Sequence, residues 1–322
     1  MLLDIEHRLT FQYDAFISES WMELRVEPRT TQHQSLNSFF LAVGPPTKVF
    51  RYKDWNGNSV HHFGVPDYHN LIEVVSRSLV ETKPQYPGLE FVTDPIPSAE
   101  AQGPLRDFTT FGGPVLRSKA LERLAKKIKV PASAPVGEQL HEVGRFVHEH
   151  LEYRPGSTNF ATTTDEVLTH DSGVCQDFAH LTLALLRLRG LPCRYVSGYL
   201  HVQRENDAPA ESHAWVEAYA PTYGWVAFDP THNQVPFEHH VVVGFGRHYD
   251  DVAPNRGIYR GKATEALTAE VRTSPSDKTG VMNLREEIGQ IEVPVYTEVP
   301  NRKARAIGLD EIADPQQQQQ QQ

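Results

Sequence analysis

The chain has 322 residues, 39% hydrophobic and 22% charged, which suits a soluble globular protein of about two domains and excludes wholesale disorder. Its net charge of −10 argues against nucleic acid or an anionic membrane as the main partner. No run of about 18 apolar residues predicts a transmembrane helix, and the first residues lack the pattern of a signal peptide, so we expect a cytoplasmic protein. Two cysteines, Cys175 and Cys193, are too few for a disulfide framework or a four-cysteine metal site.

Residues 1–82 predict an all-β domain. Apolar and polar residues alternate over several short runs, and the strand candidates are 6–13, 23–27, 38–43, 60–65 and 71–80. Asn56-Gly57 is the clearest hairpin turn, because these residue types tolerate the positive φ angles of a tight turn. Several short strands at this spacing favour a sandwich.

Residues 83–114 are rich in proline and glycine, so we interpret them as a linker that packs on the surface. Helical spacing then begins and predicts four helices, at about 118–128, 136–151, 164–168 and 174–188. The last one is apolar on both sides and should be central. Strands are expected at 193–202, 212–219, 224–228, 240–245 and 265–272. We therefore predict an α+β domain over 115–275, followed by a disordered tail, 276–322, that ends in seven glutamines.

Cys175 lies where a loop becomes the central helix. A cysteine at a helix N-terminus meets free backbone N–H groups and the positive end of the dipole, and both favour the nucleophilic thiolate. The same N–H groups can stabilise a tetrahedral oxyanion. A buried structural cysteine is the alternative, and for Cys193, on a strand, we prefer that interpretation.

A hairpin predicts a histidine–aspartate pair. In the run from Ser212 to Tyr219, small residues alternate with a face that carries His213. The next strand ends at Asp229, and pairing about a centre near residue 221 or 222 places Asp229 opposite His213 or within two residues of it. A carboxylate there would fix the imidazole tautomer and leave the other nitrogen for a thiol.

These motifs resemble those of the transglutaminase-like superfamily. Gly-Val-Cys-Gln-Asp-Phe-Ala-His-Leu (173–181) is similar to its cysteine motif, and the runs 212–217 and 225–231 resemble its histidine and aspartate motifs. Residues 1–82 look like the β-rich N-terminal domain of bacterial members. The resemblance implies an α+β, papain-like core, with a helix-borne cysteine packed on an antiparallel sheet, preceded by an all-β sandwich-like domain.

The resemblance also implies a function. Cys175 would be the nucleophile, His213 the general base and acid, and Asp229 the orienting group of a thiol acyl-transfer enzyme that acts on a peptide or protein substrate. The acceptor stays open. Water would make the protein a cysteine peptidase or amidase, and an amine a protein-glutamine gamma-glutamyltransferase or an amide-forming acyltransferase. We favour water, at roughly 55 M, because no residue visibly excludes it. A non-catalytic peptide-binding module on the same fold is the alternative from another class.

Three further residues are candidates for substrate or oxyanion contacts. Gln176 follows the nucleophile and could contribute to the oxyanion site, or simply face solvent at the helix start. Trp215 and Tyr199 could wall the acyl cleft, although an aromatic residue on a strand more often packs in the core.

We expect no metal and no cofactor. Four histidines, His232, His239, His240 and His248, invite a metal interpretation, but adjacent residues of a strand point opposite ways, so His239 and His240 cannot easily share an ion. No acidic loop cluster or EF-hand pattern suggests calcium activation.

Overall fold

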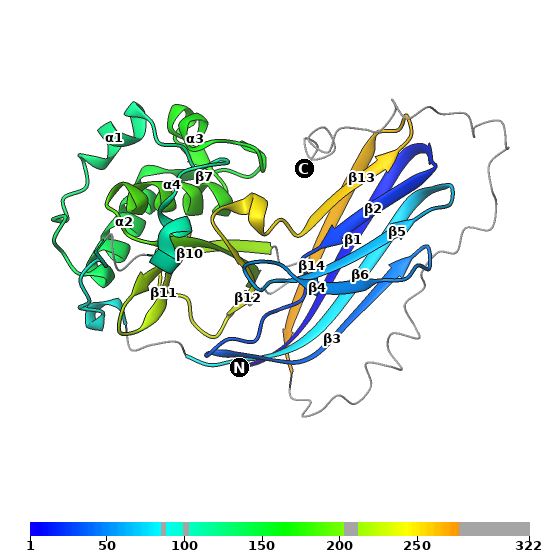
Figure 1. Cartoon of the computed structure of the whole chain (residues 1–322), viewed down its shortest axis with the longest axis horizontal. Coiled ribbons are helices and arrows are strands. Elements are labelled where there is room, and N and C mark those ends of the chain that lie inside the picture. Colours follow the sequence, from blue (N-terminus) through cyan, green and yellow to red (C-terminus); the bar gives the residue numbers. More distant parts are fainter. Residues whose placement is uncertain (85–87, 99–102, 203–211, 277–322) are drawn as a thin grey trace.

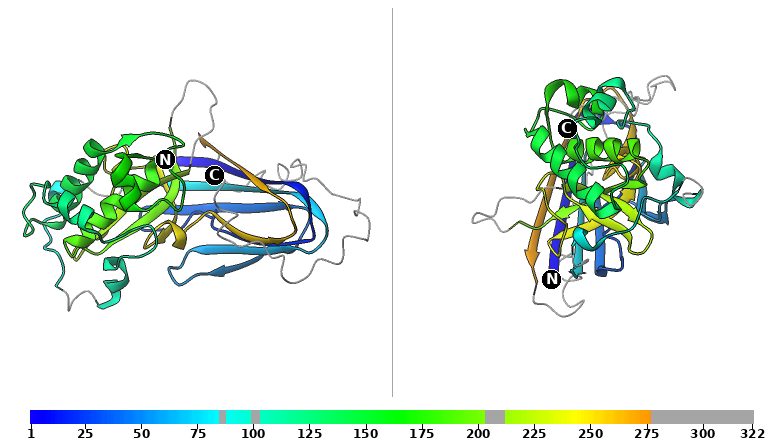
Figure 2. Two further views of the ribbon diagram at one scale, coloured as in Figure 1. Left: turned by 90° about the horizontal axis from the view of Figure 1, so that it is seen from above. Right: turned by 90° about the vertical axis from the view of Figure 1, so that its left-hand side faces the viewer.

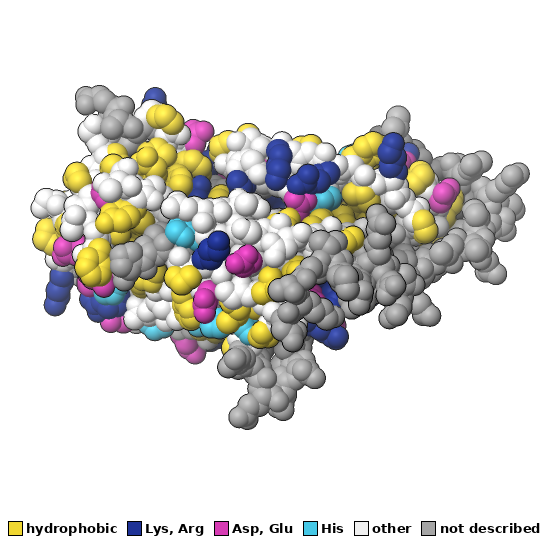
Figure 3. All heavy atoms as spheres, turned by 90° about the horizontal axis from the view of Figure 1, so that it is seen from below, with side chains coloured by type: hydrophobic (Ala, Val, Ile, Leu, Met, Phe, Trp, Pro, Cys, Tyr) yellow, Lys and Arg dark blue, Asp and Glu magenta, His cyan; other side chains and the backbone are white. Residues whose placement is uncertain are grey.

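A computed structural model describes residues 1–84, 88–98, 103–202 and 212–276, which form a β-sandwich and a helical α+β domain side by side (Figure 1). The predicted tail from residue 277 onward lies outside the described residues. Among the described residues, no helix is long and apolar enough to span a bilayer. On the face drawn in Figure 3, acidic and basic side chains are interspersed.

The sandwich consists of two four-stranded antiparallel sheets, in the strand orders β14-β1-β6-β3 and β13-β2-β5-β4. Alternate residues of the first strand are buried, and Leu9, Phe11 and Tyr13 lie in the core between the sheets, as their alternation predicts. The strands are β1 (Leu2–Ile17), β2 (Glu19–Leu24), β3 (Gln34–Gly44), β4 (Phe50–Lys53), β5 (Ser59–Val65), β6 (His69–Thr82), β13 (Asn255–Arg260) and β14 (Glu265–Pro275).

The predicted hairpin turn connects β4 and β5. Gly57 has a φ of 74°, which a glycine adopts without steric cost. The Asp54 carboxylate accepts hydrogen bonds from the backbone N–H groups of Asn56 and Asn58, both at 2.9 Å, and so closes the turn. Sequence analysis did not predict β4, whose four residues are all exposed in the structure.

The last two strands, β13 and β14, belong to the sandwich. Sequence analysis instead assigns residues 115–275 to the α+β domain. β13 pairs with β2, and β14 pairs with β1 along its length, with Leu9 opposite Ala269. Residues 255–275 therefore complete both sheets of the N-terminal domain (Figure 1). Alternation reveals that a segment is a strand, but it does not reveal which distant strand will be its neighbour.

The second half has the expected architecture of a helix packed on an antiparallel sheet. The sheet order is β11-β10-β9-β12, and two helices, α2 and α4, cover one of its faces (Figure 2). The predicted central helix is confirmed, since Leu181, Leu183 and Leu185 are all 0% exposed. The elements are α1 (Lys119–Ala125), α2 (Val136–His150), α3 (Thr164–His170), α4 (Cys175–Leu188), the short parallel pair β7 (Glu152–Tyr153) and β8 (Ser172–Gly173), β9 (Cys193–Leu200), β10 (Ser212–Ala220), β11 (Gly224–Phe228) and β12 (His240–Gly246).

The linker packs against the start of α2. Its Leu89 and Val92 side chains are buried in the core of the α+β domain. The Val136 N–H donates to the Asp94 carbonyl at 2.8 Å, and the Gly137 N–H donates to the Val92 carbonyl at 3.2 Å. The linker thus satisfies N–H groups that the first turn of a helix leaves without partners.

Side-chain amides join the two halves along the outer edge of β12. The Gln34 amide bonds both the N–H and the carbonyl of Val242, each at 2.8 Å. The Asn58 amide does the same for Phe245, at 2.9 Å for both bonds. These amides take the place of a neighbouring strand, so β12 is held by the sandwich as well as by β9.

Candidate active site

Cys175 is the first residue of α4 and is partly exposed. The Asp177 carboxylate braces this helix start, because it accepts from the Val174 N–H at 2.8 Å and from the Thr158 hydroxyl at 2.5 Å. Burial raises the pKa of Asp177 to about 6. The thiol therefore lies at the N-terminus of a buried helix, beside N–H groups that the helix does not use.

Cys193 has the opposite environment. Its side chain is 0% exposed, and its sulfur lies 3.6 Å from the Leu183 carbonyl. Burial raises the pKa of this thiol to about 11. The placement agrees with a structural cysteine.

The β10–β11 hairpin brings His213 and Asp229 together. Val216 pairs with Phe228, and this register carries Asp229 to the level of Trp215, two residues from His213. The Nε2 atom of His213 lies 2.8 Å from Asp229 Oδ2. The pair expected from the centre of the turn is therefore present in the structure.

Electrostatics favour the protonated form of His213. Burial alone would lower the pKa of His213, but hydrogen bonds with Asp229 and Cys175 outweigh burial and raise it to about 10. Since Nε2 bonds the carboxylate, Nδ1 is the ring nitrogen that remains for the sulfur. The imidazole thus links the thiol to a buried carboxylate.

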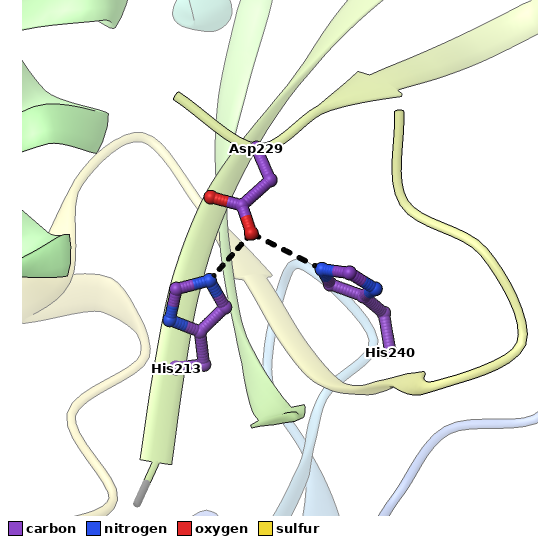
Figure 4. Close-up of side chains that lie close together, drawn as sticks. All are labelled: His213, Asp229 and His240. Carbon is purple, nitrogen blue, oxygen red and sulfur yellow. Dashed lines mark hydrogen bonds and ion pairs between the residues drawn. The ribbon is translucent and has the colours of Figure 1, made fainter. Parts of the chain in front are cut away.

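Asp229 accepts from three histidines rather than one. Two further imidazoles, from His232 and His240, lie 2.8 and 3.2 Å from the same Oδ2 atom (Figure 4 shows His213 and His240). The other oxygen, Oδ1, accepts from the backbone N–H groups of Thr231 and His232. Burial raises the pKa of this carboxyl, but the hydrogen bonds from the imidazoles outweigh burial and hold it far below its usual range.

His240 has a defined tautomer. The Phe237 N–H donates to its Nδ1 at 3.4 Å, so Nε2 carries the proton that His240 donates to Asp229. Burial lowers the pKa of His240 and keeps the ring neutral. Sequence analysis considered His232 and His240 only as metal candidates. Their approach to Asp229 could not be predicted, because it depends on the path of a loop for His232 and on the position of β12 for His240.

The same cluster contains ligand types that a metal ion could use. One donor atom each of His213, Asp229 and His240 lies within 4.8 Å of the others. Those atoms are already joined by hydrogen bonds, so an ion there would compete with the bond that orients His213. The other two histidines of the metal interpretation lie elsewhere: the ring of His239 lies 5.6 Å from that of His201 in a tilted arrangement, and His248 contacts Asp250.

The three lower-ranked candidates have other partners. Gln176 lines the cavity at Cys175, but its amide N–H group donates to the backbone carbonyls of Asn159 and Phe160. Trp215 is fully buried in an apolar cluster on the far face of the sheet, with its ring stacked near His213. Tyr199 is also buried, at the junction with the sandwich. Neither aromatic residue lines the cavity.

A cavity of about 260 Å³ opens at Cys175 and His213. One wall comes from the sandwich, which contributes His7, Leu9, Ala269 and the first residue of β13, Asn255. Sequence reasoning missed this wall, since His7 and Leu9 lie more than 160 positions from Cys175 in the chain and Ala269 lies on a strand that we had assigned to the other domain. The remaining lining residues are Thr158, Asn159, Phe160, Val174, Gln176, Tyr195, Ser197, Ser212, Ala214, Tyr249 and Pro254.

A helix-borne thiol beside an imidazole–carboxylate pair, on an antiparallel sheet, defines a papain-like protein. Comparison with known families agrees with this class: residues 122–230 match the transglutaminase-like superfamily, and residues 3–81 match the bacterial transglutaminase-like N-terminal region. The chain belongs to the transglutaminase-like superfamily.

Several relatives show how far the similarity extends. The uncharacterised protein ML0607 of Mycobacterium leprae is 33% identical over 275 residues, which cover 83% of this chain and 96% of that protein. A protein-glutamine gamma-glutamyltransferase of Pseudomonas aeruginosa is 34% identical over 103 residues, which cover 29% of this chain and 15% of that protein. A solved structure from Cytophaga hutchinsonii, named as a candidate cysteine protease, has a TM-score of 0.69 at 24% identity and covers 87% of this chain and 92% of that chain. This last likeness confirms the predicted fold.

Proposed function

We propose that the protein is a thiol acyl-transfer enzyme that cleaves peptide or amide bonds through a thioester on Cys175, with water as the acceptor. The observation that carries this proposal is the arrangement of His213, which is hydrogen-bonded through Nε2 to Asp229 and lines the same cavity as the thiol of Cys175.

The chemistry follows from these positions. The imidazolium form of His213 accompanies the thiolate of Cys175, which attacks the carbonyl carbon of the substrate. The oxyanion that forms lies near the free N–H groups at the start of α4. His213 then donates its proton to the leaving amine, and the thioester remains on the sulfur.

The second half of the reaction uses the same residues in reverse. Neutral His213 removes a proton from water, and the resulting hydroxide equivalent attacks the thioester carbonyl. The carboxylic acid leaves, and the sulfur and imidazole return to the ion pair. Asp229 holds the His213 ring in the same tautomer throughout. The carboxylate oxygen Oδ2 can only accept a hydrogen bond, so the ring proton stays on His213 Nε2.

A second candidate has an amine as the acceptor. The similarity of 103 residues to the Pseudomonas aeruginosa protein-glutamine gamma-glutamyltransferase favours it. The two candidate functions differ only in the nucleophile that attacks the thioester. The described residues of the cavity include no carboxylate that would bind a primary ammonium group. We therefore favour water.

One experiment tests both the class and the acceptor. The protein is incubated with a peptide library, with and without a primary amine, and the products are identified by mass spectrometry. New carboxyl termini or deamidated products that vanish in Cys175→Ala support the hydrolase. Amine adducts that vanish in the same variant favour the transferase. Absence of any product that depends on Cys175, together with no alkylation of Cys175 by iodoacetamide near neutral pH, would leave the binding module as the better account.

A further inference from the structure

A second cavity lies at the edge of the α+β sheet that is remote from the sandwich. Its volume is about 600 Å³, more than twice that of the cavity at Cys175, and the described residues that line the two cavities are different. Its walls come from the linker, the start of α2 and the segment that follows β11, the edge strand opposite β12 (Figure 1). The acyl-transfer steps at Cys175 make no use of this space.

The floor of the second cavity is apolar and already formed. Leu89, Val92 and Phe228 line it and are at most 4% exposed. The linker lies directly against α2, because a Cβ atom on Gly137 would be 2.1 Å from the Leu89 carbonyl oxygen. A preformed cavity with apolar walls is typical of small-molecule sites, which usually measure about 300–1,000 Å³.

The rim of the second cavity is acidic. Glu90 of the linker and Glu138 of α2 are exposed and line it, and within the described chain neither carboxylate has a basic partner. No lysine or arginine is among the described lining residues, and the Nδ1 atom of the lining residue His141 already lies 3.1 Å from the Glu142 carboxylate. Two carboxylates without a counter-charge repel an anionic ligand and attract a cation.

The N-terminus of α2 does not reverse this preference. A helix start can bind an anion through free N–H groups, but here the N–H groups of Val136 and Gly137 donate to linker carbonyls. On the other wall, Asn233 and Gln234 add side-chain amides, whose oxygens can accept hydrogen bonds from an ammonium group. The second cavity therefore combines an apolar floor with hydrogen-bond acceptors and negative charge.

We propose that the second cavity is a binding site for a small organic cation with an apolar body. The apolar part packs on Phe228 and Val92, and the ammonium group lies at the rim with Glu90 and Glu138. The volume equals roughly twenty waters at ~30 Å³ each, which is room for an aryl-alkyl amine. The proposal does not depend on acyl transfer, because the site is separate from the cavity at Cys175.

The test compares tryptamine with tryptophol, which share an indole and an ethyl chain and differ in an ammonium or a hydroxyl group. Their dissociation constants are measured by isothermal titration calorimetry near neutral pH. The full-length chain carries Cys175→Ala, so that the amine cannot enter acyl transfer. Tryptamine should bind about 2- to 30-fold more tightly than tryptophol, as two exposed ion pairs allow, and this advantage should shrink at high salt.

Matched variants locate the binding. Glu90→Gln together with Glu138→Gln should abolish the advantage of tryptamine over tryptophol. The control replaces two other exposed glutamates by glutamine, Glu122 and Glu149, which do not line the cavity, so the net charge changes equally and the advantage should remain. Thr93→Lys places an ammonium group of the chain itself at the exposed rim and should also abolish the advantage.

Three results would overturn the proposal. Equal dissociation constants for the two probes would show that the glutamates do not recognise a cation. An advantage of tryptamine that survives the Glu90→Gln and Glu138→Gln substitutions would place its binding elsewhere. Absence of binding by both probes up to their solubility limits would exclude a site for this class of ligand. All three leave acyl transfer at Cys175 to be decided by the peptide-library experiment.

Discussion

Replacing Asp229 by asparagine is a sharp test of the site, because neither orientation of the amide fits the hydrogen bonds of the carboxylate. Oδ2 accepts from three imidazoles, and Oδ1 accepts from two backbone N–H groups, so both oxygens face only donors. An asparagine must place its NH₂ group against one of these two sets. At least one buried donor then loses its acceptor, at a cost of about 1–3 kcal/mol.

The kinetic effect depends on the tautomer of His213. If the NH₂ group of Asn faces His213, Nε2 must accept, and the proton moves to Nδ1, the nitrogen that serves the thiol. If the NH₂ group faces the backbone, the ring keeps its tautomer but loses the carboxylate charge. We expect Asp229→Asn to fold with reduced stability and to lose on the order of 10⁴-fold in kcat/KM, the loss that the same substitution causes in a known catalytic triad.

The pH dependence supplies a second signature. The His213 pKa is raised to about 10 from its ordinary value of 6.5, so the imidazolium contributes stability that is fully present below pH 6.5 and is lost as the pH rises through 10. In the wild type, kcat/KM should therefore begin to decline only as the pH approaches the raised pKa of His213. Without the Asp229 charge the decline should move toward neutral pH.

The assay is a pH profile of kcat/KM for wild type and variant, with urea unfolding to measure the loss of stability. Asp171→Asn is the control, since Asp171 is exposed and left-handed at a helix end, where asparagine is well tolerated. An Asp229→Asn protein with the wild-type rate and profile would refute both the hairpin geometry and the role given to the carboxylate.

The other predictions concern the two thiols, His240 and the tail. Cys175→Ala should abolish turnover, with a loss of about 10⁴-fold or more and an unchanged circular dichroism spectrum; residual activity near wild type would exclude the thioester. Cys193→Ala should keep its activity and lose about 1 kcal/mol of stability, measured by urea unfolding, because the thiol only fills space in the core. His240→Leu should lower kcat by a larger factor than it changes KM, because Asp229 loses a hydrogen-bond donor. His240→Gln should recover part of the loss in kcat. His239→Gln, next to it on the opposite side, should behave as wild type, and equal losses in both variants would assign His240 a purely structural role. Deleting 277–322 should leave both the melting temperature and turnover unchanged, since the last described backbone hydrogen bond beside β14 runs from the Ser276 N–H to the Leu2 carbonyl; a lower melting temperature would contradict this.

Local pattern predicted most of the elements that carry the site. The apolar spacing from Val174 to Leu188 predicted a central helix with Cys175 at its start, and the structure begins α4 at Cys175. The turn centre near residue 222 predicted the His213–Asp229 pair, because in a tight hairpin the turn sets the register of every facing residue. Both depend on neighbours within 17 residues of one another in the chain, which is why the sequence alone determined them.

Only the tertiary structure decided what surrounds those three residues. β14 adds to β1 across more than 250 residues, and it brings Ala269 beside Leu9 in the cavity wall. His240 reaches Asp229 from β12. Hydrogen bonds from the sandwich hold this strand along its outer edge. Alternation states which face of a strand is apolar, but many pairings bury such a face equally well, and the choice among them is made by packing over the whole chain. The sequence therefore determined the reactive groups, and the assembled fold determined the cavity in which they meet a substrate.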